Sequence, residues 1–200
     1  HRMTGGVYLI DRPCLENAMR IDMGAAPMVS EMNRHGFLID TSHLTTLSSL
    51  LAEHYERHLC EIEALVGKRI NPGSSDQVAQ LLFRDLKLQL PGGQVILTAT
   101  GQQSTDADTL NLLLPAHPVV KPILDARGVA KLKDTYADKL PRMISREDGR
   151  LRTTLRQDVP RTARLSSEDP NLQNIPIRDE LGREIRAAFI ASPGCVLGGC

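Results

Sequence analysis

The sequence lacks an excess of charge of either sign, because 24 lysines and arginines balance 24 aspartates and glutamates. Its totals therefore show neither the positive surplus typical of a nucleic-acid-binding protein nor an acidic tail. Any electrostatic signal must be local. With 200 residues and an apolar share of 41%, the chain is long enough for one domain or two small ones with an ordinary core.

Closely spaced cysteines and long apolar runs are also missing. Cys14, Cys60, Cys195 and Cys200 have no CxxC spacing and no histidine at a metal-ligand interval. This pattern argues against a zinc site and a disulfide framework, so we expect no metal site and a reducing, cytoplasmic setting. The longest apolar stretches are far shorter than the roughly 20 residues of a membrane-spanning helix, and residues 1–3 resemble no targeting signal. We expect a soluble protein.

Apolar periodicity predicts a long helix over residues 40–67. Its stripe has alternating spacings of three and four residues and comprises Leu44, Leu47, Leu51, His54 or Tyr55, His58, Ile62 and Leu65. A second helix is expected before it, with Pro27 near its start, Val29 and Met32 facing inward, and Gly36 ending it ahead of an extended Phe37-Leu38-Ile39. The two helices suggest an antiparallel pair. From periodicity alone, an ordinary helical hairpin or coiled-coil arm is the favoured interpretation.

The middle of the chain predicts two short capped helices separated by a loop. Residues 74–77, Ser-Ser-Asp-Gln, resemble a capping box ahead of Val78, Leu81 and Leu82. Residues 91–105 have the composition of a loop, after which Ser104 or Thr105 is expected to cap a short helix. A capped helix start beneath a loop could hold a phosphate through its N–H groups, although most caps bind nothing.

From residue 118 onward a helical region gives way to strand. Apolar residues keep helical spacing up to Leu140, with Lys131, Lys133 and Lys139 on the outside, where a solvated lysine face is the simpler interpretation. After a turn at residues 147–149, Leu151, Thr153 and Leu155 alternate with arginines. Residues 142–164 contain seven arginines against three acids. This local basic segment suggests phosphate contact.

Residues 162–178, Thr-Ala-Arg-Leu-Ser-Ser-Glu-Asp-Pro-Asn-Leu-Gln-Asn-Ile-Pro-Ile-Arg, are densely polar without a helical or strand period. The pattern predicts a loop whose donors and acceptors need water or a polar ligand. Such side chains can contact base edges or phosphates. Ordinary turns also use Ser, Asp, Pro and Asn, so this alternative stays open.

This run, followed by residues 182–189, Gly-Arg-Glu-Ile-Arg-Ala-Ala-Phe, closely resembles the stretch before the first catalytic motif of family A, polymerase I-like, DNA polymerases. The resemblance continues backwards, in family order, through residues 149–151, 131–136, 116–118, 104–105 and 76–77. It implies a mainly α fold with a small antiparallel β portion (α+β). The implied parts are a lead-in over residues 1–22, a helical thumb-like region over 23–141 with its tip around 91–114, and the start of a palm-like region over 142–200.

The resemblance also implies which residues contact DNA. Arg164 matches the arginine that enters the minor groove at the primer terminus, and Asn171, Gln173, Asn174 and Arg178 match polar residues along the duplex behind it. Lys131, Lys133 and Tyr136 match thumb positions at the DNA backbone, and Ser104 and Thr105 match the phosphate-holding tip. One departure is Ala163, where the family usually has glycine, because a β-carbon there could hold the duplex away.

We therefore expect a portion of a DNA-directed DNA polymerase that grips the primer–template duplex. The family's metal-binding aspartates match no carboxylate of this chain, so no catalytic residue is assigned, and the Mg²⁺ of the complete polymerase would be held elsewhere. The isolated chain is expected to be inactive and to need the rest of the chain or a second polypeptide carrying the remaining palm and fingers. The alternatives are a non-catalytic duplex-binding module derived from a thumb and, with little support, a helical scaffold.

Overall fold

The computed structural model describes residues 12–99, 101–157, 164–177 and 179–198, with side chains from residue 16 onward. It divides into two compact units. Thr41–Pro141 forms the first, called the helical unit below, and His1–Asp40 together with Arg142–Cys200 forms the second, called the strand unit. The fold is mainly helical with small antiparallel sheets, which confirms the expected fold class. Residues 23–40, which sequence analysis grouped with the helical region, belong to the strand unit.

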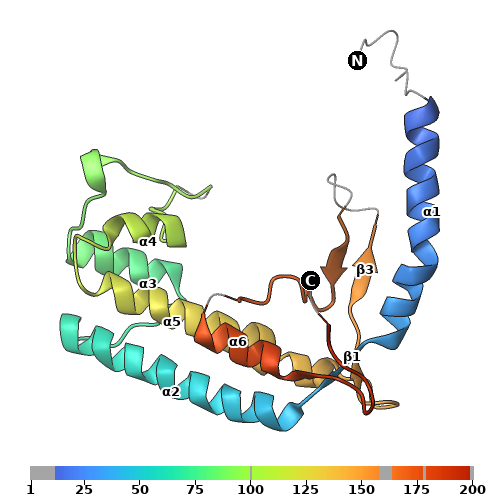
Figure 1. Ribbon diagram of the computed structural model, residues 1–200. Helices are drawn as coiled ribbons and strands as arrows, with labels where there is room; N and C mark the ends of the chain where they lie inside the picture. The colour runs from blue at the N-terminus through green and yellow to red at the C-terminus, as the bar shows by residue number, and fades with distance from the viewer. Residues whose placement is uncertain (1–11, 100, 158–163, 178, 199–200) are drawn as a thin grey trace. The chain divides into compact units, whose positions relative to one another are not determined.

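In the helical unit, α2 (Thr41–Val66) packs along α5 (Val120–Leu132), as Figure 1 shows. The predicted stripe is confirmed at Leu44, Leu47, Leu51 and Ile62, all buried. Leu59 is buried while Leu65 is 44% exposed, because the contact face drifts by a residue toward the end of the helix. Gly67 then ends the helix at φ +71°, as predicted.

The remainder of the helical unit consists of short helices. They are α3 (Ser75–Ala79), the π-helix η1 (Gln80–Asp85), the 3-10 turn η2 (Pro91–Gly93), α4 (Ala107–Leu113), the π-helix η3 (Lys133–Ala137) and the 3-10 turn η4 (Leu140–Met143), which crosses the boundary. Val78, Leu81 and Leu82 are buried in the main core, as predicted. Together α2, α3, η1, α4 and α5 enclose an almost wholly aliphatic core. Its free energy comes from burial of branched side chains from several elements at once.

The two predicted caps are only partly correct. Ser74 Oγ does accept the N–H of Gln77 at 3.4 Å, but Gln77 Oε1 accepts the N–H of Asn71 at 2.9 Å instead of that of the cap residue. The N-cap of α4 is Asp106, whose Oδ1 accepts the N–H of Thr109 at 2.8 Å. The prediction that Ser104 or Thr105 caps this helix was therefore wrong: both residues are buried and precede the N-cap.

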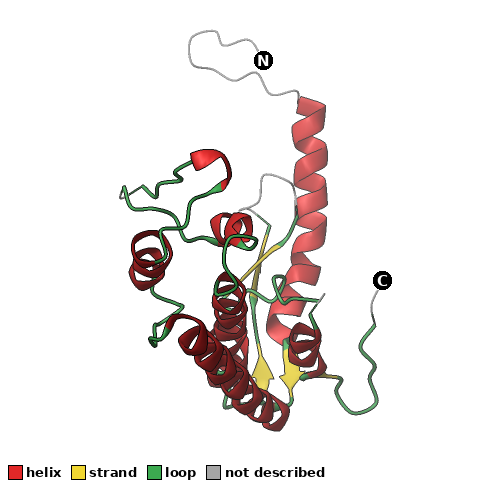
Figure 2. Cartoon of the chain, turned by 90° about the vertical axis from the view of Figure 1, so that its left-hand side faces the viewer, coloured by secondary structure: helices red, strands yellow, loops and turns green. Residues whose placement is uncertain are grey.

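In the strand unit, α1 (Arg12–His35) leads into β1 (Phe37–Ile39), the centre of an antiparallel sheet of order β2-β1-β5. β2 is Arg150–Leu151 and β5 is Phe189–Ile190. The expected end of the helix at Gly36 and the extended segment after it are confirmed. Gly36 has φ +64°, and a β-carbon there would lie 2.5 Å from the carbonyl oxygen of Leu151, so this crossing needs glycine. Figure 2 shows these short strands in yellow.

The first helix is much longer than predicted. Pro27 lies inside α1 rather than near its start, since one proline removes one helical hydrogen bond without ending the helix. Val29 is buried as expected, but Met32 is 45% exposed. Within the helical unit α2 packs on α5, and within the strand unit α1 packs on β3 (Thr154–Arg156) through Asn33, which bonds both the N–H and the carbonyl of Leu155.

The densely polar run also contains more regular structure than predicted. Ser166–Glu168 forms β4, which pairs antiparallel with β3 so that Leu155 faces Ser167. α6 (Glu180–Ala187), which sequence analysis did not predict, follows it. Among the described residues, no helix is both long and apolar enough to cross a membrane.

Candidate nucleic-acid interface

The residues after β4 form a compact turn held by its own side chains. Asn171 Oδ1 accepts the backbone N–H of Gln173 at 3.1 Å, as in the local turns that asparagine favours. Gln173 Nε2 donates to the carbonyl oxygen of Leu165 at 3.0 Å. We call residues 164–165 and 169–174, which flank β4, the polar turn. These two bonds fix residues 171–173 beside the start of β4, where Arg164 lies.

The polar turn displays most of the side chains that sequence analysis assigned to duplex contact. Arg164, Asn171, Gln173 and Asn174 are all exposed. The three amides follow one another closely along the chain, and the bond of Gln173 to the carbonyl oxygen of Leu165 ties them to the residue that follows Arg164. Arg178 and Ala163, the other residues assigned here, lie outside the described residues.

A groove of about 410 Å³ continues from the polar turn within the strand unit. It is lined by Gln173, Asn174, Ile175, Pro176, Ile177, Asp179 and Arg186. Arg186, exposed on α6, contributes a cation to the lining of this groove, which also includes Asp179. Arg186 had no role assigned from the sequence. The signal that could have identified it is its place in the family-like motif of residues 182–189.

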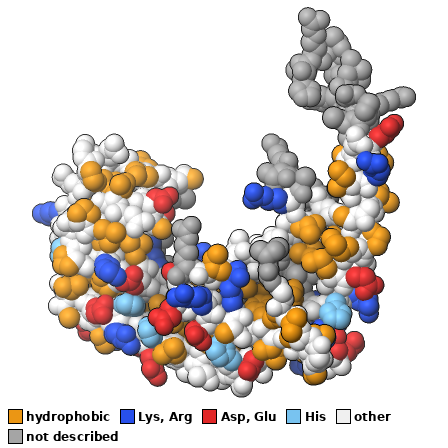
Figure 3. Space-filling model, in the orientation of Figure 1, with side chains coloured by type: hydrophobic (Ala, Val, Ile, Leu, Met, Phe, Trp, Pro, Cys, Tyr) orange, Lys and Arg blue, Asp and Glu red, His pale blue; other side chains and the backbone are white. Residues whose placement is uncertain are grey.

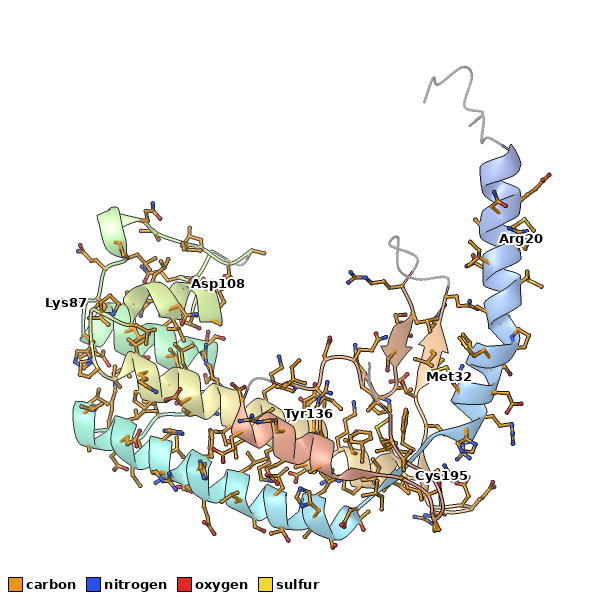
Figure 4. All side chains as sticks on the ribbon, viewed as in Figure 1. Arg20, Met32, Lys87, Asp108, Tyr136 and Cys195 are labelled. Carbon is orange, nitrogen blue, oxygen red and sulfur yellow. The ribbon has the colours of Figure 1, made fainter. Side chains whose placement is uncertain are left out.

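The lysines and the tyrosine of the helical unit differ in how far they are engaged. Lys131 is exposed on α5. Lys133 Nζ lies 2.5 Å from Asp138 Oδ2, and Asp138 Oδ1 accepts the hydroxyl of Ser48 on α2 at 2.5 Å. Tyr136, labelled in Figure 4, is only 3% exposed, and burial raises the pKa of its phenol. Of the three, Lys131 has the charge most open to a polyanion.

Ser104 and Thr105 lie at the base of the 91–105 loop and are 5% and 4% exposed. Arg127 of α5 donates to the carbonyl oxygen of Pro72 at 2.6 Å, to Thr105 Oγ1 at 3.3 Å and to the Thr105 carbonyl. Desolvation lowers the pKa of this guanidinium, which stays charged because arginine titrates so high. Arg127 thus anchors Thr105, while Ser104 Oγ accepts the N–H of Asp106 at 3.2 Å. Contact of either hydroxyl with phosphate remains a prediction.

Residues 12–99, 101–157, 164–177 and 179–198 contain no group of three or more His, Cys, Asp or Glu side chains placed to hold a metal ion. A pair of divalent cations in a phosphoryl-transfer site needs such a cluster of carboxylates. The described residues therefore do not fit a magnesium site.

Comparison with known proteins bears on the family of the chain. Residues 41–199 match the family described as DNA polymerase family A. The chain belongs to this family. It is 42% identical over 170 residues to the thermostable DNA polymerase I of Thermus thermophilus and 36% identical over 200 residues to the DNA polymerase I of Deinococcus radiodurans. These alignments cover 85% and 98% of the chain but only 20% and 21% of the relatives, so the chain spans about a fifth of their length.

A solved structure shows the same relationship in three dimensions. The POL domain of Pol1 from M. smegmatis, in complex with DNA primer–template and dNTP, has a TM-score of 0.74 and 37% identity to the chain. The match covers 86% of the chain and 30% of that domain's chain. The resemblance inferred from the sequence is thereby confirmed: the chain is a family A DNA polymerase region with a POL-domain fold.

Proposed function

We propose that this chain is the part of a DNA polymerase that grips the primer–template duplex during template-directed synthesis. The observation that carries the proposal is the polar turn, where Arg164 is exposed beside three exposed amide side chains on a fixed backbone. The similar POL domain was solved with primer–template DNA. Residues 23–141 would act as the thumb-like grip, with its tip around 91–114, and residues 142–200 as the start of the palm.

The chemistry of these side chains suits the minor groove. Every base pair presents an acceptor there, purine N3 or pyrimidine O2, at nearly the same place. A guanidinium and amide N–H groups can donate to these acceptors without distinguishing one sequence from another. Arg164 and Gln173 would thus test the shape of the pair at and behind the primer terminus, and Asn171, Asn174 and Arg178 would extend the contact.

Lysines of the helical unit would supply the sequence-independent part of the grip. Lys131 is exposed, and Lys133 keeps two of its three ammonium protons available beyond Asp138. Contacts with phosphate position the duplex without reading its sequence. The family resemblance also assigns backbone contact to Tyr136, Ser104 and Thr105, whose burial means that they would contribute less than the lysines. Because the described residues fit no magnesium site, we expect the 200-residue polypeptide alone not to incorporate nucleotides; the rest of a polymerase, on the same or a second polypeptide, would supply that site.

The direct test is binding of the purified chain to a fluorescent primer–template duplex across a salt series. Wild-type binding should weaken as salt rises, since each neutralised phosphate releases counterions. Arg164→Ala should weaken binding by roughly 10- to 150-fold, the equivalent of about 1.5–3 kcal/mol for a hydrogen bond to a charged group. The matched control is Arg146→Ala, which removes another exposed arginine of the same basic segment that is not part of the polar turn.

A folded chain that ignores duplex DNA, or equal losses for Arg164→Ala and Arg146→Ala, would contradict the proposal. A primer-extension assay on the same samples separates the remaining alternatives. Binding without extension that becomes extension when the rest of a polymerase is supplied supports a portion of an enzyme. Binding that no such addition converts into extension supports a stand-alone duplex-binding module.

A further inference from the structure

Two buried hydroxyls lie directly beneath the polar turn. Thr153, between β2 and β3, is 8% exposed, and Ser167, in the middle of β4, is 1% exposed. Their oxygens lie 2.6 Å apart. Buried hydroxyls have to be hydrogen-bonded to be tolerated, so the partners of this pair show what it holds in place.

Those partners are the backbone groups of the polar turn. Thr153 Oγ1 lies 2.8 Å from the carbonyl oxygen of Pro170 and 3.0 Å from that of Glu168. Ser167 Oγ accepts the N–H of Leu172 at 3.0 Å and lies 3.2 Å from the Pro170 carbonyl. The donors can be assigned consistently: Thr153 donates to Pro170, Ser167 donates to Thr153, and Leu172 donates to Ser167.

This network fixes the backbone on both sides of Asn171, the first exposed amide of the polar turn. Pro170 and Leu172 are its two neighbours, and Gln173 follows immediately. The hydroxyls are buried and cannot themselves reach a ligand. Their bonds do, however, decide where the amides of Asn171 and Gln173 point.

We infer that Thr153 and Ser167 are positioning residues for duplex contact: they hold the polar turn in the conformation that presents Asn171 and Gln173. The inference rests on the proposed function and deepens it, because neither residue is assigned to DNA. It requires that removing either hydroxyl alters DNA binding through the turn, without removing any group that contacts DNA.

The chain offers matched controls for both residues. Ser166 is the neighbour of Ser167 on β4, and its buried Oγ finds no hydrogen-bond partner among the described residues. Ser166→Ala therefore removes a hydroxyl that does no positioning, while Ser167→Ala removes one that does. Thr153→Val removes the hydroxyl and keeps the shape of the side chain. Thr153→Ser keeps the hydroxyl and should therefore retain duplex binding.

Two readouts on the full chain test the inference. Amide hydrogen exchange over residues 171–174 should accelerate by about tenfold in Ser167→Ala and Thr153→Val, the effect of losing one hydrogen bond. Duplex affinity should fall about tenfold in the same two variants and stay within about twofold in Ser166→Ala and Thr153→Ser. In a Gln173→Ala background, Ser167→Ala should cost less than it does alone, because the two residues act on the same contact.

The outcomes separate this inference from the function on which it rests. Wild-type binding that Ser167→Ala and Thr153→Val leave unchanged overturns the positioning role and leaves the proposed function intact. Equal losses in Ser166→Ala and Ser167→Ala overturn it too, as would a Gln173→Ala background that leaves the full cost of Ser167→Ala in place. A wild-type chain that folds but binds no duplex overturns both.

Discussion

The helical unit and the strand unit use their polar side chains in opposite ways. In the helical unit, most of the residues assigned to DNA also hold the fold: Lys133 pairs with Asp138, and Thr105 accepts from Arg127. In the strand unit these two tasks fall to different residues: Thr153 and Ser167 are buried and bond the backbone of the polar turn, while the polar turn's own Arg164 and amide side chains are exposed. A polar residue in a family-like motif therefore need not be exposed to a ligand. Duplex contact by this chain should therefore depend more on the polar turn than on the helical unit.

The largest effect is expected where the helical unit depends on its aliphatic core. Leu82 is fully buried there, so Leu82→Ala should cost about 2–5 kcal/mol of unfolding free energy through lost burial and the cavity left behind. Leu112→Ala is the matched control, because Leu112 is 45% exposed, and it should change stability by less than about 0.5 kcal/mol. Urea unfolding measures both. Similar losses would mean that the core is not where the structure places it.

A smaller loss should follow when the anchor of the 91–105 loop is removed. Arg127→Met deletes the donors to Pro72 and Thr105 while keeping much of the packing, which should cost about 1.5–3 kcal/mol. Arg127→Lys should recover only part of this, since an ammonium cannot reproduce the fork of donors. Arg84→Met, at an exposed arginine of the same unit, serves as the control in thermal unfolding. Equal melting temperatures for Arg127→Met and Arg84→Met would contradict the anchoring role.

How far the sequence predicts this molecule differs between the units for physical reasons. The helix of α2 and the glycines that follow α1 and α2 could be predicted, because helical periodicity and left-handed φ are local properties. The α4 cap could not, since the choice among Ser104, Thr105 and Asp106 depends on Arg127, which comes from a distant helix. β4 was missed because its strand pairs only three residues and buries a serine rather than an apolar side chain.

The candidate site shows the same division. The exposed residues of the polar turn were found through resemblance to a family, since polar composition alone fits an ordinary turn. Their supports, Thr153 and Ser167, carried no distinguishing sequence signal: only the pairing of β3 with β4 brings these hydroxyls together. Likewise, Lys133 forms an ion pair with Asp138, five residues further on, which the helical periodicity of apolar residues does not predict.

Substitution of the two lysines should sharpen the comparison in the helical unit. Lys131→Ala should lower the salt slope of duplex binding by about 1 and leave the unfolding free energy unchanged. Lys133→Ala should also cost up to about 1 kcal/mol of stability, because it leaves Asp138 without its cation. Paired binding and urea titrations separate the two effects. A Lys131→Ala slope equal to that of wild type would remove Lys131 from the proposed grip.

The smallest effect concerns the turn before β2. Hydrogen bonding to Arg152 holds the pKa of the Asp148 carboxyl well below its usual range. A carboxyl with a depressed pKa in the folded state adds stability above its unfolded pKa of about 3.9 and loses it as pH falls further. Asp148→Asn should therefore be slightly less stable than wild type at neutral pH, and the gap should have begun to narrow at about pH 3, below the unfolded pKa and on the way to the still lower pKa of the folded state. Urea unfolding at both pH values checks this; a gap independent of pH would contradict it.

We expect Arg164 to donate to a minor-groove acceptor, and this is tested most directly by a duplex from which that acceptor has been removed. Duplex binding is compared for a primer ending in guanine and one ending in 3-deazaguanine, which lacks the N3 acceptor, with wild type, Arg164→Ala and Arg146→Ala. The account predicts that loss of N3 weakens wild type and Arg146→Ala by about tenfold and leaves Arg164→Ala almost unaffected. An equal loss in all three proteins would contradict it.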